Sequence, residues 1–169
     1  MATIESETPW HLRGNWAPVQ TEVTAENLTV EGSIPPQLEG VYIRTGPNPK
    51  SGFSPHWFMG DGMVHGVRLS QGKAEWYRNR FVQTPNITKT GNSSTPDLGD
   101  LSYGSGNTHV VTHAGTILCL EEGHWPWKID KELNTVGFEN YGGSLTTSRT
   151  AHPKICPETG ELLAFSYFS

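Results

Sequence analysis

The stretch GMVHGVRLSQGKAEWYRNRFV, residues 62 to 82, contains two runs of strand-forming residues on either side of a short turn. Gly62 to Leu69 and Lys73 to Val82 each have the length and the β-branched or aromatic content of a strand. Ser70-Gln71-Gly72 lies between them, and glycine has the backbone freedom that a tight hairpin turn requires. We therefore predict an antiparallel hairpin over residues 62–82.

The same pattern continues in both directions and predicts an all-β protein. Further strands are expected at residues 40–45, 107–113, 116–122, 135–141, 150–155 and 161–168, with turns at 46–49, 114–115 and 157–160. Residues 1 to about 25 have the pattern of an extended lead-in, and residues 83–106 that of a long polar loop, which is often functional at such a length. Short strands punctuated by turns fit a sandwich, a barrel or a propeller, and the pattern alone does not choose between them.

Composition and charge exclude several classes of function. The chain has 169 residues, enough for one domain, and its net charge of -5 without a run of Lys or Arg argues against a nucleic-acid partner. Cys119 and Cys156 form no CxxC motif, so we expect two free thiols in a reducing cytoplasm. The N-terminus lacks the pattern of a signal peptide, and no segment has the roughly 20 apolar residues of a membrane helix.

The chain contains seven histidines, and most of them are expected to be structural. His109 and His113 have HxxxH spacing, which on a helix would let them share a metal ion. Their β-branched surroundings predict a strand instead, where four residues span roughly 13 Å, too far for a shared ion. We expect His56 and His65 to pack or to form hydrogen bonds, and His11 and His124 to lie at the surface or in loops.

His152 differs from the other histidines because Pro153 follows it. A residue before proline is driven towards an extended backbone, and this fixes the direction of its side chain. A fixed direction suits a metal ligand and suits the start of a strand equally well. Spacing and residue type alone therefore leave both interpretations of His152 open.

Five segments, taken in order, resemble the carotenoid cleavage dioxygenase family, which includes apocarotenoid oxygenases and lignostilbene dioxygenases. They are IRTGPNP (43–49), HWFMGDGMVHGVRL (56–69), YRNRFV (77–82), NTHVVTHAGTILCLEEG (107–123) and TAHPK (150–154). The resemblance extends over about residues 14 to 168. It implies a seven-bladed β-propeller, of which this chain would supply about two to three blades. Residues 1–169 would then be the truncated N-terminal part of a single propeller domain.

The resemblance also implies the site and the reaction. Members of this family hold Fe(II) with four histidines and use O2 to cleave a conjugated double bond into aldehyde or ketone products. His152 in TAHPK corresponds to the first iron ligand. Glu122 corresponds to a carboxylate that orients an iron histidine, and Glu121 is the second choice for this role. A carboxylate in this position fixes the tautomer of the imidazole. The other three iron ligands would lie beyond residue 169, so we expect the chain to be inactive alone.

The resemblance implies two substrates, O2 and a carotenoid or apocarotenoid. One alternative is a dioxygenase that cleaves stilbenes of the lignostilbene type, and another is an inactive propeller fragment with a binding or scaffold role. Imidazole ligands would also suit zinc, copper or nickel, so iron rests on the resemblance alone. Long polyenes dissolve in membranes, which makes peripheral membrane contact compatible with a cytoplasmic location. No partner protein is implied.

Overall fold

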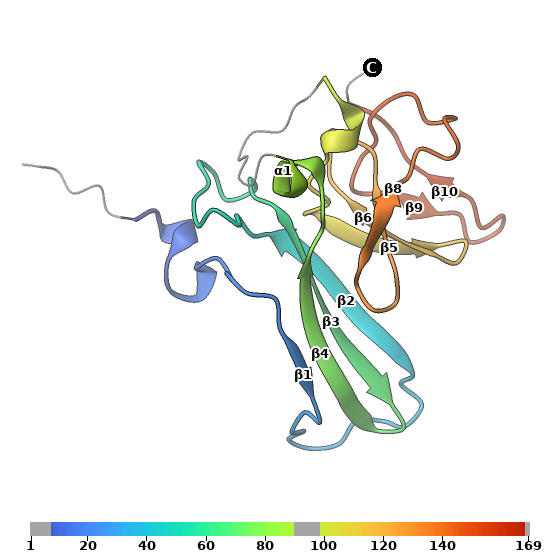
Figure 1. The fold of residues 1–169 in the computed structure, drawn as a ribbon. Helices are drawn as coiled ribbons and strands as arrows, with labels where there is room; N and C mark the ends of the chain where they lie inside the picture. The colour runs from blue at the N-terminus through green and yellow to red at the C-terminus, as the bar shows by residue number, and fades with distance from the viewer. Residues whose placement is uncertain (1–7, 90–98, 168–169) are drawn as a thin grey trace, which may run out of the picture.

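A computed structural model describes residues 8–89 and 99–167 of the chain. It contains two four-stranded antiparallel sheets and one two-stranded hairpin, joined by loops and a few very short helices (Figure 1). The all-β class predicted from the sequence is confirmed. Within the described residues, no helix is long and apolar enough to cross a membrane.

The first sheet is built around the predicted hairpin. Its strands are β1 (Thr24–Glu26), β2 (Gly40–Pro47), β3 (Gly62–Ser70) and β4 (Lys73–Phe81), in the spatial order β1-β4-β3-β2. Gln71 and Gly72 form the turn between β3 and β4 with φ values of 48° and 76°. Two successive positive φ values match the twist of the flanking strands, which explains why the short connection closes the hairpin.

The second sheet is a simple meander. Its strands are β5 (His109–His113), β6 (Thr116–Leu120), β7 (Trp127–Ile129) and β8 (Thr135–Phe138), in the order β5-β6-β7-β8. Ala114 and Gly115, with φ values of 47° and 76°, repeat the same tight turn between β5 and β6. The predicted strands over 107–113 and 116–122 are therefore present, with shorter bounds.

The remaining elements are short. They are the hairpin of β9 (Lys154–Ile155) and β10 (Leu162–Leu163), the α-helix α1 (Pro85–Thr88), and the 3-10 helices η1 (Trp10–Leu12), η2 (Gly14–Trp16) and η3 (Leu101–Tyr103). Gly160 has a φ of 74° in the predicted turn between β9 and β10. Pro153 has no N–H to donate to a ladder, so the hairpin begins only after it.

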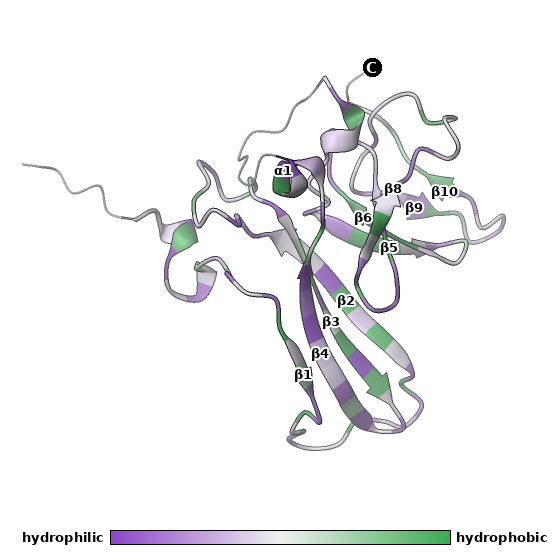
Figure 2. Cartoon of the chain, viewed as in Figure 1, coloured by the Kyte–Doolittle hydropathy of each residue, from purple (hydrophilic) through white to green (hydrophobic). Residues whose placement is uncertain are grey.

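The two large sheets share one hydrophobic core. Val64 and Val82, from the region of the first hairpin, pack with Cys119, Trp127 and Leu133 from the second sheet and its loops. Along β2 and β3, hydrophobic residues are interspersed with hydrophilic ones (Figure 2), as expected for strands with one face on a core. The upper part of β4 is mostly hydrophilic, with the run Arg78-Asn79-Arg80. Because one core holds both sheets, the loops between them keep fixed relative positions.

Several strand predictions need correction. β1 and β7 were not predicted, because three residues are too few for a visible period, and β1 is polar. The strands predicted at 150–155 and 161–168 shrink to two residues each, and Phe168 lies outside the described residues. The predicted loop 83–106 contains α1 and η3. Its residues 90–98 lie outside the described residues.

Candidate functional site

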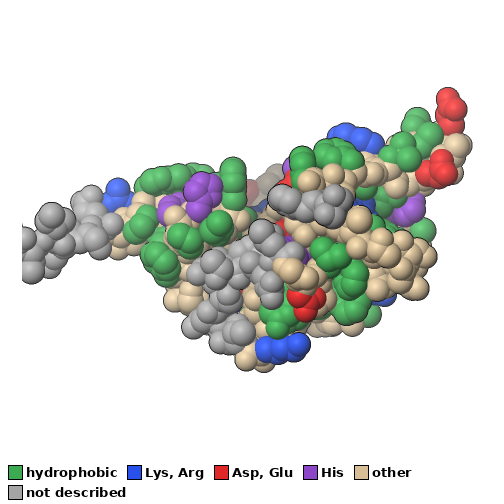
Figure 3. Space-filling view, turned by 90° about the horizontal axis from the view of Figure 1, so that it is seen from above, with side chains coloured by type: hydrophobic (Ala, Val, Ile, Leu, Met, Phe, Trp, Pro, Cys, Tyr) green, Lys and Arg blue, Asp and Glu red, His purple; other side chains and the backbone are tan. Residues whose placement is uncertain are grey.

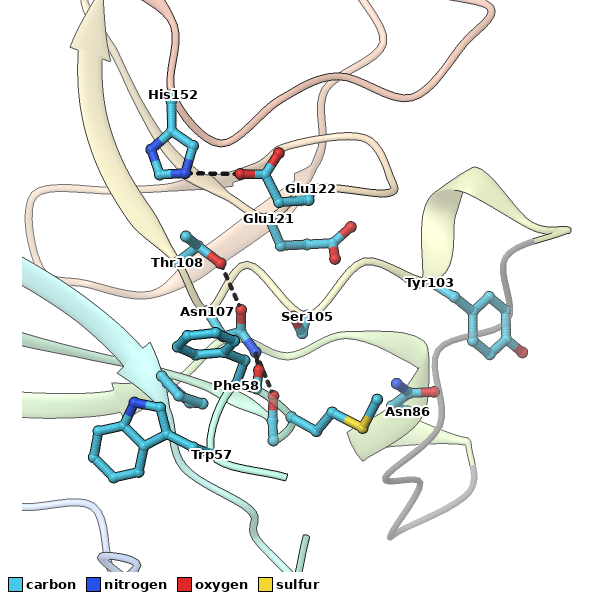
Figure 4. Close-up of a pocket in the computed structure, with 13 residues that line it drawn as sticks. Trp57, Phe58, Asn86, Tyr103, Ser105, Asn107, Thr108, Glu121, Glu122 and His152 are labelled. Carbon is cyan, nitrogen blue, oxygen red and sulfur yellow. Dashed lines mark hydrogen bonds and ion pairs between the residues drawn. The ribbon is translucent and has the colours of Figure 1, made fainter. Parts of the chain in front are cut away.

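A pocket of about 540 Å³ opens beside the ends of β2 and β6. Its apolar wall comes from the loop that follows β2, through Trp57, Phe58 and Met59, and from Pro47. Its polar wall contains Asn86, Tyr103, Ser105, Asn107, Thr108, Glu121, Glu122 and His152 (Figure 4). The pocket therefore gathers the three residues predicted for the site, His152, Glu122 and Glu121.

The two glutamates follow the last residue of β6, Leu120, and direct their carboxylates differently. Figure 4 shows the carboxylate of Glu122 directed at His152 and that of Glu121 directed away from it, towards Tyr103. One strand end thus delivers two carboxylates to different parts of the same pocket.

Glu122 holds the segment that carries His152 with both of its oxygens. Its Oε1 lies 2.8 Å from Nε2 of His152, and its Oε2 accepts a hydrogen bond of 3.2 Å from the backbone N–H of Ala151. The His152 side chain is 62% exposed and that of Glu122 is 36% exposed. The imidazole is therefore oriented by a carboxylate and still accessible from the pocket.

The backbone next to His152 is fixed from several sides. His109 Nδ1 lies 2.8 Å from the carbonyl oxygen of Ala151, and the Thr150 hydroxyl accepts a bond of 3.1 Å from the N–H of His152. Ala151 is fully buried against Leu118 and Leu120 of β6. These contacts place His152 at the pocket wall, two residues before β9.

Glu121 pairs with a different histidine. Nδ1 of His124 donates to Oε1 of Glu121, and the backbone N–H of Gly123 donates to the same oxygen over 3.0 Å. His124 lies in the loop between β6 and β7, one of the two expected positions, but its side chain is 0% exposed and therefore not at the surface. The neighbouring Gly104 allows this burial, because a Cβ there would come within 2.7 Å of the His124 Cβ. The buried pair lies in a loop, where no hydrophobic periodicity could have predicted it.

The other histidines have structural roles. His109 and His113 lie on β5, so the predicted strand is confirmed, and His113 Nε2 lies 2.9 Å from the carbonyl oxygen of Gly160. His56 Nδ1 accepts a hydrogen bond from the N–H of Phe58, and His65 Nδ1 lies 2.8 Å from the hydroxyl of Tyr77. Burial, with help from the Arg44 guanidinium, lowers the pKa of His65 to about 4. These two histidines form the hydrogen bonds predicted for them.

His11 and the cysteines complete the comparison with the sequence. His11 lies in η1 and its Nε2 is 3.2 Å from the carbonyl oxygen of Ser54. Cys119 and Cys156 are both free thiols. Burial raises the pKa of Cys119 to about 12, which leaves this thiol protonated and unreactive at neutral pH.

Asn107 is a site residue that the sequence reasoning missed. It is buried, and its Nδ2 donates to the carbonyl oxygens of Gly60, over 2.8 Å, and of Phe58, over 3.2 Å. These bonds hold the aromatic loop against the polar wall of the pocket. Asn107 is a polar residue of the NTHVV motif, which could have indicated a site residue. It was instead predicted to be part of a strand, and that strand begins only at His109.

The described residues include side chains of the kind that bind metal ions. His152 and Glu122 provide one accessible imidazole and one carboxylate, both common around bound metal ions. Within residues 8–89 and 99–167, no group of three or more His, Cys, Asp or Glu could hold a metal ion. The donor set thus fits one ligand and its orienting carboxylate, in a site that needs further ligands.

A pocket with an aromatic wall and an oriented histidine has the features of a small-molecule binding site in this all-β protein. Residues 16–169 match the family described as Retinal pigment epithelial membrane protein (RPE65). The chain therefore belongs to this family of carotenoid oxygenases, and the predicted resemblance is confirmed.

Named relatives agree with this assignment. The chain is 48% identical over 172 residues to the Carotenoid cleavage oxygenase of Mycobacterium tuberculosis, covering 96% of this chain and 34% of that protein. It is 38% identical over 200 residues to the Carotenoid 9,10(9',10')-cleavage dioxygenase 1 of Phaseolus vulgaris, covering 96% and 36%. The chain thus spans about a third of the length of these curated relatives.

A solved structure shows the same fold. The crystal structure of Pseudomonas brassicacearum lignostilbene dioxygenase superposes with a TM-score of 0.81 at 33% sequence identity. The match covers 95% of this chain and 37% of that chain. The antiparallel arrangement described above is therefore shared with a dioxygenase of the same family.

Proposed function

We propose that this chain forms part of a non-haem Fe(II) dioxygenase that uses O2 to cleave a conjugated double bond of a carotenoid or apocarotenoid. The observation that carries the proposal is the contact of 2.8 Å between His152 Nε2 and Glu122 Oε1 at the wall of an aromatic pocket. Family membership supports the same reaction. The products would be aldehydes or ketones.

The proposal includes the architecture. Each four-stranded antiparallel sheet has the size of a propeller blade. We infer that the two sheets are blades of a seven-bladed propeller and that residues 1–169 act together with further blades. The share of about a third of the relatives' length supports this inference.

The residues of this chain would have distinct tasks in the reaction. His152 would be one of four imidazole ligands, and Glu122 would hold its ring in the orientation that binding requires. Bound iron(II) would supply the redox chemistry that lets O2 react with the double bond. Trp57, Phe58 and Met59 would pack along the polyene and exclude water from it.

The test uses the complete translated protein with the substitutions His152→Ala, Glu122→Gln and, as a matched control, His113→Ala. His152→Ala should lose most of its bound iron and all detectable cleavage, because a direct ligand is gone. Glu122→Gln keeps all imidazoles and should lose about 10- to 100-fold in affinity or activity. His113 does not line the pocket, and its Nε2 lies 2.9 Å from the carbonyl oxygen of Gly160, so its removal should leave iron unchanged.

Iron is measured by plasma spectrometry and products by chromatography of the aldehydes. Full iron content and full activity in His152→Ala would overturn the proposed role of this residue. An intact, iron-loaded protein that cleaves neither polyenes nor stilbenes would overturn the proposed reaction.

A second substrate class has a specific observation in its favour. The lignostilbene dioxygenase structure matches with a TM-score of 0.81, and a pocket walled by Trp57 and Phe58 can stack on the rings of a stilbene. A stilbene would be cleaved by the same chemistry. Comparing kcat/KM for an apocarotenal and for a hydroxylated stilbene decides between the two classes.

A further inference from the structure

One carboxylate in the pocket is not used by the proposed iron site. Glu121 lines the pocket, and its carboxylate points away from His152 (Figure 4). Its side chain is only 13% exposed. A carboxylate in a largely apolar cavity is costly unless its oxygens accept hydrogen bonds. We therefore asked which hydrogen-bond donors stabilise the carboxylate of Glu121 in this position.

The two oxygens of Glu121 have different surroundings. Oε1 accepts from both His124 Nδ1 and the N–H of Gly123. Oε2 accepts a hydrogen bond from no residue that the structure describes. Because an ionised carboxylate only accepts, Nδ1 of His124 carries the proton of this pair. Oε1 is thus held in place, and Oε2 can accept a hydrogen bond from a ligand in the pocket.

The pair is also rigid. His124 is fully buried, and the space beside it is so limited that a Cβ on Gly104 would lie 2.7 Å from the His124 Cβ and 3.3 Å from Glu121 Oε1. An acceptor held in this way needs no ordering when a ligand binds, which favours its use in recognition.

We propose that Glu121, held in place by His124, accepts a hydrogen bond from a hydroxyl group of the substrate, and that the preferred substrate is a polyene with a hydroxylated end. The inference rests on the proposed function and names its substrate class. A long apolar chain fits the wall of Trp57, Phe58 and Met59, whereas only a donor satisfies Glu121. A polyene without a hydroxyl would desolvate Oε2 and leave it unpaired, which a site of this kind penalises.

The test measures binding separately from cleavage in the complete protein. Four probes are titrated by quenching of tryptophan fluorescence: an apocarotenal with a ring hydroxyl, the same apocarotenal without it, a para-hydroxylated stilbene and unsubstituted stilbene. The wild type should bind the hydroxylated apocarotenal about 10- to 100-fold more tightly than its partner, the range expected for a hydrogen bond to a charged group.

Three variants complete the experiment. Glu121→Leu should abolish the preference for the hydroxylated apocarotenal, and Glu121→Gln, which keeps an oxygen but loses the charge, should reduce it several-fold. Glu132→Gln removes one negative charge from an exposed position outside the pocket, so it should behave as the wild type. Circular dichroism checks the fold, and Glu121→Gln decides the result if Glu121→Leu does not fold.

Equal affinity of the wild type for both apocarotenals, or an unchanged preference in both Glu121 variants, would overturn the inference. A hydroxyl preference confined to the stilbenes would overturn the assignment to polyenes. Absence of cleavage with a preserved hydroxyl preference in binding would instead count against the proposed reaction, so the two failures are distinguishable.

Discussion

Glu122 and Glu121 show how much one peptide step can change at the end of a strand. The two residues have the same side chain, yet Glu122 contacts His152 and Ala151, whereas Glu121 contacts His124 and Gly123. Both residues lie just after β6, which ends at Leu120. Glu122, the first choice from the resemblance, is the glutamate that lies beside His152. The roles of both residues stay predictions.

The pairing of Glu121 with His124 depends on a residue without a side chain. In Gly104→Ala the new Cβ would meet the His124 Cβ at 2.7 Å and the backbone oxygen of Trp125 at 3.2 Å. We expect a loss of about 1–3 kcal/mol in the free energy of unfolding, the usual cost of overpacking. Urea denaturation measures it. Gly46→Ala is the control, because its nearest neighbour is a flexible Arg44 atom at 3.9 Å, and equal losses in both variants would contradict the argument.

At the scale of elements, the hairpins were the most predictable part of the molecule. Turn residues at 71–72 and 114–115 adopt the positive φ values that two-residue turns require, and the flanking strands contain many β-branched and aromatic residues. By contrast, β1 and β7 pair through three residues each. Their formation depends on a neighbouring strand rather than on their own sequence, and this tertiary dependence is invisible in a local pattern.

The candidate site was predictable only where a motif carried it. His152 and Glu122 came from the resemblance of TAHPK and LCLEEG, and the structure brings them within 2.8 Å of each other. The His124 and Asn107 contacts were missed because they join loops to the pocket, and loops have no period to interpret. Burial of His124 follows from the space beside Gly104, a three-dimensional fact.

The two histidines of strand β5 lie beside different carbonyl groups, and this difference leads to a prediction. His109 reaches the Ala151 oxygen beside His152, and His113 reaches the Gly160 oxygen in the turn between β9 and β10. In the complete protein, His109→Ala should weaken iron binding several-fold through a less well-positioned His152, whereas His113→Ala should not.

Iron affinity is measured by competition with a chelator, and the thermal midpoint of each variant reports its general loss of stability. His109→Gln, which restores a side chain able to bond the Ala151 oxygen, should recover part of the affinity. If the two alanine variants lose iron equally, the contact with Ala151 does not position His152.

At the scale of the whole molecule, the described chain presents an extensive apolar surface. Large aromatic side chains are exposed near both ends of the chain and in the loop after β2. They include Trp10, Trp16, Phe58, Phe165 and Tyr167, between 55% and 71% exposed each. Figure 3 shows hydrophobic side chains spread over both sides of the face seen from above. Surfaces of this kind mark contacts with other protein segments or partners.

The sheets add open edges to this surface. β1 and β8 are outermost in their sheets, and the hairpin β9–β10 forms a sheet with only two strands. Unpaired edge strands offer backbone donors and acceptors to another chain. Residues 1–169 expressed by themselves should therefore self-associate at micromolar concentration, with a sedimentation coefficient that rises with concentration.

The same isolated chain should bind iron weakly. Its described residues provide one imidazole at the site, that of His152, beside the carboxylate of Glu122. Two side chains leave most coordination positions of an iron ion to water. We expect less than one equivalent of iron after gel filtration, and the same amount in the His152→Ala form of the chain, because neither contains a complete site. A concentration-independent monomer that retains one full equivalent of iron, and loses it on His152→Ala, would show that residues 1–169 complete the site without further blades.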